Sequence, residues 1–186
     1  MDNVKPDTNV YKLGQKLKRA DLALMRFIRK TECPTLTFLM RFITEIGSPV
    51  GWTVISLGIM FTDNFTGGIG LQIGLVSLCA AFIAKGIKHA FRRTRPCTHQ
   101  NFPKALAPVP DRWSFPSGHT TSAFAVGFFL LGAPHATAPF FLTLAVSVAC
   151  SRVYLGVHFP SDVFGGACLG SIVGLSLFPF MNLWFA

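Results

Sequence analysis

Charged residues are scarce in this sequence. Of its 186 residues only 13% are Asp, Glu, Lys or Arg, whereas 51% are apolar, and the mean hydropathy is +0.47. A soluble domain carries about a quarter charged residues, so this composition argues against an ordinary soluble protein. The charges are confined to short stretches, and the uncharged runs between them approach the ~20 residues that cross a bilayer. The sequence therefore predicts an integral membrane protein.

Acidic residues are rarer still. Eight Asp and Glu stand against 17 Lys and Arg, which gives a net charge of +9. Basic residues beside membrane segments usually face lipid headgroups or an anionic substrate, so we expect membrane lipids as partners and no nucleic acid. The five cysteines contain no CxxC pair and no carboxylate cluster is present, so we expect no disulfide framework, no metal and no other cofactor.

Residues 1–47 form a basic segment that we expect to lie on the membrane surface. They hold nine of the Lys and Arg residues, and the first 22 residues have no apolar run, so we expect no cleaved secretory signal. In "LALMRFIRK" and "LTFLMRFITEI", apolar residues recur three and four apart with cations between them, which is typical of interfacial amphipathic helices. Pro34 separates the two helices.

Residues 48–186 are predicted to form one transmembrane domain. Five apolar runs predict an all-α bundle of five transmembrane helices, or six if the N-terminal segment holds another: 49–61, 68–87, 120–133, 138–157 and 162–185. In the last run, small residues four apart favour close helix packing; they are Gly165, Gly166, Gly170 and Gly174. Counting spans places residues 88–115, residues 151–162 and the N-terminal segment on one face.

Three polar clusters reach that face: residues 88–96, residues 116–119 and residues 151–162. Ionisable groups at membrane depth are costly, so they indicate function by default. Lys88 and Arg95 in the first cluster and Arg152 in the third suit an anion of charge about −2, since arginine's planar fork matches phosphate oxygens. Ser117 and Gly118 in the second cluster stand where a helix begins, and free N–H groups there bind anions.

Two histidines suit two different tasks. His158 precedes Asp162 by four residues, so a helix that begins near Pro160 allows the carboxylate to accept a hydrogen bond from one ring nitrogen. The other nitrogen then becomes a better nucleophile. His119 lies in a separate segment and is free to donate a proton to a departing alkoxide. These are the parts of phosphoryl transfer without a metal.

The three clusters together resemble the signature of the type 2 phosphatidic acid phosphatase (PAP2) superfamily. They read Lys88-x6-Arg95-Pro96, then Pro116-Ser117-Gly118-His119, then Ser151-Arg152-x5-His158-x3-Asp162. The resemblance implies a membrane helical bundle, with 48–186 as its catalytic domain, that hydrolyses lipid phosphates without metal through a phosphohistidine. It implies that His158 is the nucleophile, Asp162 its partner and His119 the acid. The phosphoryl oxygens would be held by Lys88, Arg95, Ser117, Gly118 and Arg152.

Other readings compete with a phosphatase. An intramembrane serine hydrolase is disfavoured because the sequence has no GxSxG elbow and such an enzyme has no use for three cations. A non-catalytic lipid-phosphate binder or transporter with the same fold is the second alternative. A vanadate haloperoxidase uses a similar pocket but is soluble. Undecaprenyl diphosphate is the first expected substrate, and phosphatidic acid, phosphatidylglycerophosphate and lipid A phosphates remain open.

The membrane face of the site is the subject of two conflicting expectations. We expect a multi-pass protein of the cell (inner) membrane. With five spans, every Lys and Arg falls on the face of the polar clusters, and the positive-inside rule then favours the cytoplasm. Many bacterial members of the resembled family instead have six spans and a site outside the cytoplasm.

Overall fold

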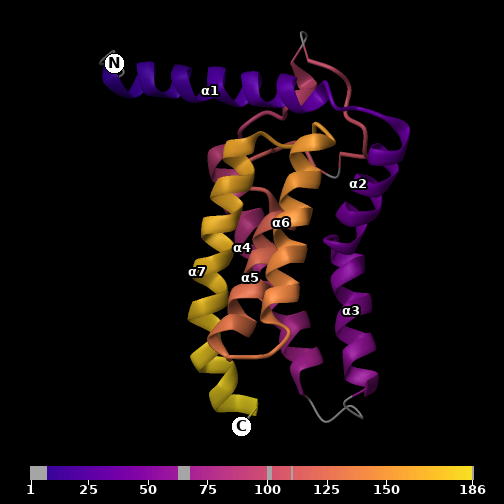
Figure 1. The fold of residues 1–186 in the computed structure, drawn as a ribbon. Coiled ribbons are helices and arrows are strands. Elements are labelled where there is room, and N and C mark those ends of the chain that lie inside the picture. Colours follow the sequence, from indigo (N-terminus) through magenta and orange to yellow (C-terminus); the bar gives the residue numbers. More distant parts are fainter. Residues whose placement is uncertain (1–7, 63–67, 100–101, 110, 186) are drawn as a thin grey trace.

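The predicted all-α fold is confirmed by the computed structural model, which describes residues 8–62, 68–99, 102–109 and 111–185 (Figure 1). Within these residues the predicted apolar runs coincide with five successive helices, α3 to α7. The helices are α1 (Thr8–Arg29), α2 (Pro34–Ile46), α3 (Pro49–Thr62), α4 (Ile69–Phe91), α5 (Gly118–Gly132), α6 (Ala138–Tyr154) and α7 (Pro160–Phe185), with a 3-10 turn at Pro96–Thr98.

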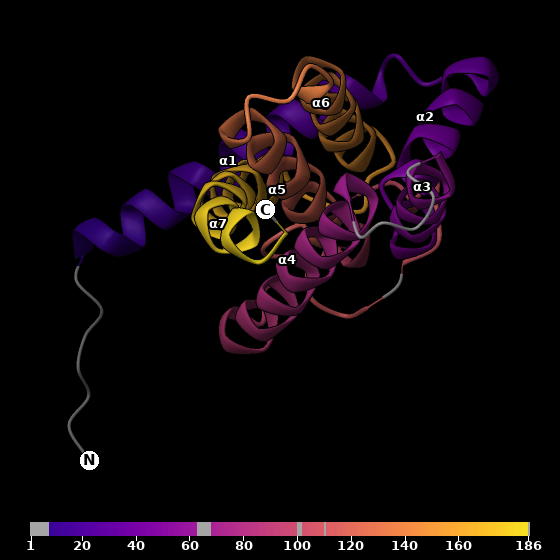
Figure 2. The same cartoon turned by 90° about the horizontal axis from the view of Figure 1, so that it is seen from below.

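Helix α5 is the central helix of the bundle and contacts α4, α6 and α7 (Figure 2). Its close approach to α7 depends on the predicted small residues. A Cβ on Gly166 would lie 2.8 Å from the Ser117 carbonyl oxygen, and one on Gly170 or Gly174 would collide with carbonyl oxygens of α5. Gly165 differs, because it faces the ring of Phe115. Small residues thus let the two backbones touch, as is common in membrane bundles.

The two N-terminal helices differ in how they meet the bundle. Helix α1 lies across one end of it (Figure 1), and Asp21 and Met25 are buried among the α1 side chains that the structure describes. Helix α2 was also expected to lie on the surface. It instead runs down beside α6 and continues into α3 with a bend of 62°. Pro34 opens α2 and Gly47 ends it.

The described helices differ in whether they are long and apolar enough to cross a bilayer. By length and composition, α4 and residues Pro160–Met181 of α7 can each cross a bilayer alone, and the bent pair α2–α3 adds a third span if it counts as one. Helix α6 is apolar but shorter. Figure 1 places α1, the end of α4, the starts of α5 and α7 and the end of α6 at the same end of the molecule. The three polar clusters therefore share one end.

Candidate active site

Two of the predicted phosphate-binding cations hold an aspartate of the same chain. Lys88, in the last turn of α4, donates from Nζ to Asp111 Oδ2 at 2.6 Å. Arg95 donates from Nη2 to Asp111 Oδ1 and from Nε to its main-chain oxygen, both at 2.7 Å. Burial acts to raise the pKa of Asp111, but the hydrogen bonds and charges of the two cations outweigh it and lower the pKa. A charged carboxylate thus occupies donors that phosphate oxygens would use.

The nucleophile candidate His158 is buried, and Arg95 fixes its tautomer. Arg95 Nη1 lies 3.1 Å from His158 Nε2. Since a guanidinium only donates hydrogen bonds, Nε2 must accept, and the proton of the neutral ring is on Nδ1. Burial first, and then the charges of Arg152 and Arg95, lower the pKa of His158 well below its usual value. The ring is therefore neutral at neutral pH, with its lone pair on Nε2.

Asp162 lies beside His158, but the expected hydrogen bond is not made in this arrangement. The distance from His158 Nδ1 to Asp162 Oδ2 is 3.7 Å, which exceeds hydrogen-bonding range. The same Oδ2 accepts the main-chain N–H of Phe159 at 2.8 Å. The other oxygen, Oδ1, accepts from Arg93 Nη1 at 2.7 Å. The pair needs to close by under an ångström for the carboxylate to bind the Nδ1 proton.

The predicted helix start at Ser117 and Gly118 is where α5 begins. Ser117 is the N-cap, and its N–H donates to the Asp162 carbonyl oxygen at 3.1 Å, which ties α5 to the start of α7. A Cβ placed on Gly118 would meet nothing within 4 Å, so the helix terminus faces open space. His119 follows in the first turn and borders the same space.

Arg152 lies in the last turn of α6, and two of its guanidinium nitrogens have no hydrogen-bond partner among the described residues. Its guanidinium is buried, and Nη1 donates to Thr44 Oγ1 of α2 at 2.6 Å. Its Nε and Nη2 are also buried, and no described residue accepts a hydrogen bond from either. Unpaired buried donors are costly unless a ligand accepts from them. Arg152 thus fits an anion-binding role.

One cavity of about 860 Å³ joins these residues to an apolar channel. Its lining includes five of the eight predicted site residues: Lys88, Arg95, Gly118, His119 and His158. The rest of the cavity runs between α3 and α4, where it is bordered by Trp52, Leu57, Met60 and residues from Leu71 to Lys88. At 1.5 Å of rise per residue, that stretch of α4 is about 26 Å long. The arrangement suits a polar head with a long apolar tail.

The candidate serines of a hydrolase lack the required geometry. Ser117 Oγ accepts from Thr120 Oγ1 at 2.9 Å, and Ser151 Oγ donates to the Val148 carbonyl oxygen at 2.7 Å. A serine nucleophile needs a histidine within hydrogen-bonding reach. Both hydroxyl groups instead bond within their own helix or its cap.

Comparison with known proteins identifies the family. The model of the PAP2 superfamily matches residues 69–185. The chain belongs to this superfamily. It is 31% identical to an undecaprenyl-diphosphatase of Sulfolobus acidocaldarius over 81% of this chain and 73% of the relative. It is 30% identical to a decaprenylphosphoryl-5-phosphoribose phosphatase of Mycobacterium tuberculosis over 87% and 91% of the two chains.

A solved membrane protein of the same family has a similar fold. The crystal structure of the transmembrane PAP2-type phosphatidylglycerolphosphate phosphatase from Bacillus subtilis aligns with a TM-score of 0.70 and 27% identity. The alignment covers 90% of this chain and 87% of that one. These findings confirm the predicted PAP2 family and the predicted enzyme class, a membrane phosphatase that acts on lipid phosphates.

Proposed function

We propose that this chain removes phosphate from a lipid phosphate or diphosphate without a metal ion, through a phosphohistidine on His158. The observation that carries the proposal is the single cavity with the cationic site at one end and an apolar channel at the other. Lys88, Arg95 and Arg152 supply the positive charge that Mg²⁺ supplies in other phosphoryl-transfer enzymes.

The proposed reaction has two steps. His158 Nε2 attacks the terminal phosphorus and the N–P bond forms. The P–O bond to the leaving group, the lipid alcohol or, in a diphosphate, the lipid monophosphate, breaks while His119 gives its proton to the leaving oxygen. Water then attacks the phosphohistidine and gives a proton to His119, and the N–P bond breaks to release inorganic phosphate. Asp162 accepts the Nδ1 proton in a hydrogen bond and stabilises the charge on the ring. The hydroxyl group of Ser117 and the N–H group of Gly118 hold phosphoryl oxygens.

Undecaprenyl diphosphate is the first proposed substrate. The length of the channel along α4, about 26 Å, supports a substrate with a long apolar tail. Two matched relatives are named as phosphatases of polyprenyl compounds. Substrates of other PAP2 proteins provide the comparison set, which is phosphatidic acid, phosphatidylglycerophosphate and lipid A phosphate.

The purified full-length protein tests both parts of this proposal. Phosphate release is measured on each lipid in detergent micelles, with EDTA or vanadate added, and with His158→Ala as the inactive control. We expect the highest kcat/KM on undecaprenyl diphosphate, full activity in EDTA and inhibition by vanadate. Activity that is lost in EDTA and restored by Mg²⁺ would overturn the metal-independent mechanism. Binding without phosphate release from any lipid would favour the non-catalytic alternative.

We also propose five membrane crossings, with the active-site end toward the cytoplasm. The crossings are the bent pair α2–α3 and the helices α4, α5, α6 and α7, while α1 lies in the interface with its apolar face in the lipid. Helix α1 then acts as the surface segment, whereas α2, although it belongs to residues 1–47, is part of a crossing and joins the catalytic domain proposed for residues 48–186. The placement of the described Lys and Arg residues at the active-site end supports this orientation.

A further inference from the structure

Helix α1 is anchored to the bundle at two positions one turn apart. Met25 is fully buried and packs with Phe159, the residue that follows the nucleophile candidate. Asp21 is 3% exposed, although Lys18 and Arg19 beside it are exposed. Burying an acid is costly unless it is paired, so the burial of the acid in a basic helix indicates a specific partner.

The partners of Asp21 come from the segment that carries the catalytic dyad. Asp21 Oδ1 accepts the main-chain N–H of Ser161 at 3.0 Å, and Oδ2 accepts the Ser161 hydroxyl at 2.5 Å. Arg93 Nη2 also donates to Oδ2, at 2.7 Å. The carboxylate thus holds the residue directly before Asp162 by two hydrogen bonds, and it holds Arg93 by an ion pair.

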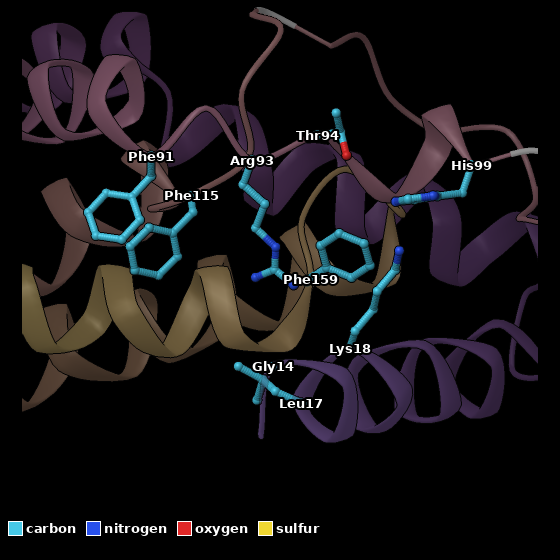
Figure 3. Close-up of a pocket in the computed structure, with 9 residues that line it drawn as sticks. All are labelled: Gly14, Leu17, Lys18, Phe91, Arg93, Thr94, His99, Phe115 and Phe159. Carbon is cyan, nitrogen blue, oxygen red and sulfur yellow. The ribbon is translucent and has the colours of Figure 1, made fainter. Parts of the chain in front are cut away.

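Arg93 connects this network to Asp162. Its Nη1 donates to both Ser161 Oγ and Asp162 Oδ1 at 2.7 Å. The guanidinium also lies 4.3 Å from the centroid of the Phe159 ring, and Figure 3 shows the two side chains next to each other. Arg93 therefore bridges two buried carboxylates, one on α1 and one beside His158.

We propose that Asp21 is a positioning residue for the phosphatase reaction, acting through Arg93 and Ser161 on Asp162. This role rests on the proposed function of His158 and Asp162. By holding one end of Arg93, Asp21 limits the guanidinium to a single bond with Asp162 Oδ1 and leaves Oδ2 facing the Nδ1 of His158. Without Asp21, Arg93 is free to bind Asp162 through both nitrogens, which draws the carboxylate away from the histidine.

Asp21→Asn tests the role in the full-length enzyme. We expect kcat on undecaprenyl diphosphate to fall by about 10- to 100-fold, as small displacements of catalytic groups do. KM should stay within about twofold, because Asp21 bonds none of the three phosphate-binding cations. Glu32→Gln is the matched control: it also removes a carboxylate from an arginine, Arg29, but the Glu32 side chain is 40% exposed and bonds neither Arg93 nor Ser161, so kcat should not change.

A mutant cycle with Arg93→Gln separates positioning from a general structural effect. If Asp21 acts mainly through Arg93, the loss of kcat in the double variant should be clearly smaller than the product of the two single losses. Losses that multiply, or wild-type kcat in Asp21→Asn, would overturn the positioning role alone. If Asp21→Asn does not fold, Arg93→Gln alone serves as the test, because it removes the bridge from Asp21 to Asp162, and wild-type kcat there has the same meaning. A wild-type protein that hydrolyses no lipid phosphate would refute the proposed function and the positioning role together.

Discussion

At the scale of single residues, alanine substitutions of the two histidines should have different effects on activity. His158→Ala removes the nucleophile, so neither phosphoenzyme nor phosphate release should be detected with any substrate. His119→Ala should slow the cleavage of a lipid phosphate by about 10²- to 10⁴-fold. It should slow the cleavage of p-nitrophenyl phosphate much less, because that leaving group departs without a proton. The measurement is kcat for both substrates, and equal losses would contradict the role of His119 as the acid.

Gly118 offers a second test at this scale. A methyl group at this position meets no atom of the protein, but it projects toward the space where the phosphate should bind. Gly118→Ala should therefore leave the melting temperature unchanged and lower kcat/KM by about tenfold or more. Gly86→Ala is the control, because its added methyl group also meets nothing and lies on α4 outside the cavity lining. Wild-type kcat/KM in Gly118→Ala would contradict the proposed anion site.

The sequence was informative about the residues that carry recognisable spacing. Lys88, His119 and His158 stand in motifs, and the structure brings them to one cavity. Asp111 was missed because it lies 23 residues from Lys88 and 16 from Arg95, in a loop without periodicity. The Asp21–Arg93 pair was missed for the same reason. The signal that was available for it was an acid among six basic residues of α1.

At the scale of helices, the close contact between α5 and α7 should make the stability of the fold sensitive to any side chain added at the glycines between them. Gly170→Ala would push a methyl group against the carbonyl oxygen of Thr121, and the backbones would have to separate. Overpacking of this kind costs about 1–3 kcal/mol. Gly170→Ala should therefore lower the melting temperature in detergent, while Gly86→Ala should not. Equal melting temperatures of the two variants would show that α5 and α7 yield more easily than the structure indicates.

The positions of the helices were more predictable than their directions. Apolar runs bounded by Pro, Gly and charges predicted α3 to α7 to within a few residues. The charges of residues 34–46 led to the expectation of a surface helix there, yet α2 descends beside α6. The reason is tertiary: Thr44 on α2 accepts a hydrogen bond from the buried Arg152. The two residues are 108 positions apart in the sequence, so the residue pattern of α2 alone does not predict the contact.

At the scale of the whole molecule, the described Lys and Arg residues are concentrated at the active-site end. Every Lys or Arg that the structure describes belongs to α1, α2, the turn between them, the C-terminal parts of α4 and α6, or the loop between α4 and α5. The opposite end holds the turn between α5 and α6 and the C-terminus (Figure 1). Some of these cations serve the phosphate site, but those of α1 do not belong to the signature. The asymmetry in α1 is therefore a topological signal.

Labelling of single cysteines by a membrane-impermeant maleimide tests that signal in intact cells. Cys33 is exposed and joins α1 to α2, so it lies at the active-site end. Ala136 is exposed in the turn between α5 and α6 at the other end, and Ala136→Cys in a cysteine-free background is its matched partner. We expect the reagent to label the cysteine at 136 and to spare Cys33 until the membrane is permeabilised. The reverse pattern would place the active site outside the cytoplasm.

Cys97, in the loop after α4, tests the number of crossings. It should behave like Cys33, because α2–α3 and α4 are the two crossings between them. A Cys97 that is labelled while Cys33 is spared would require a sixth crossing between the two cysteines.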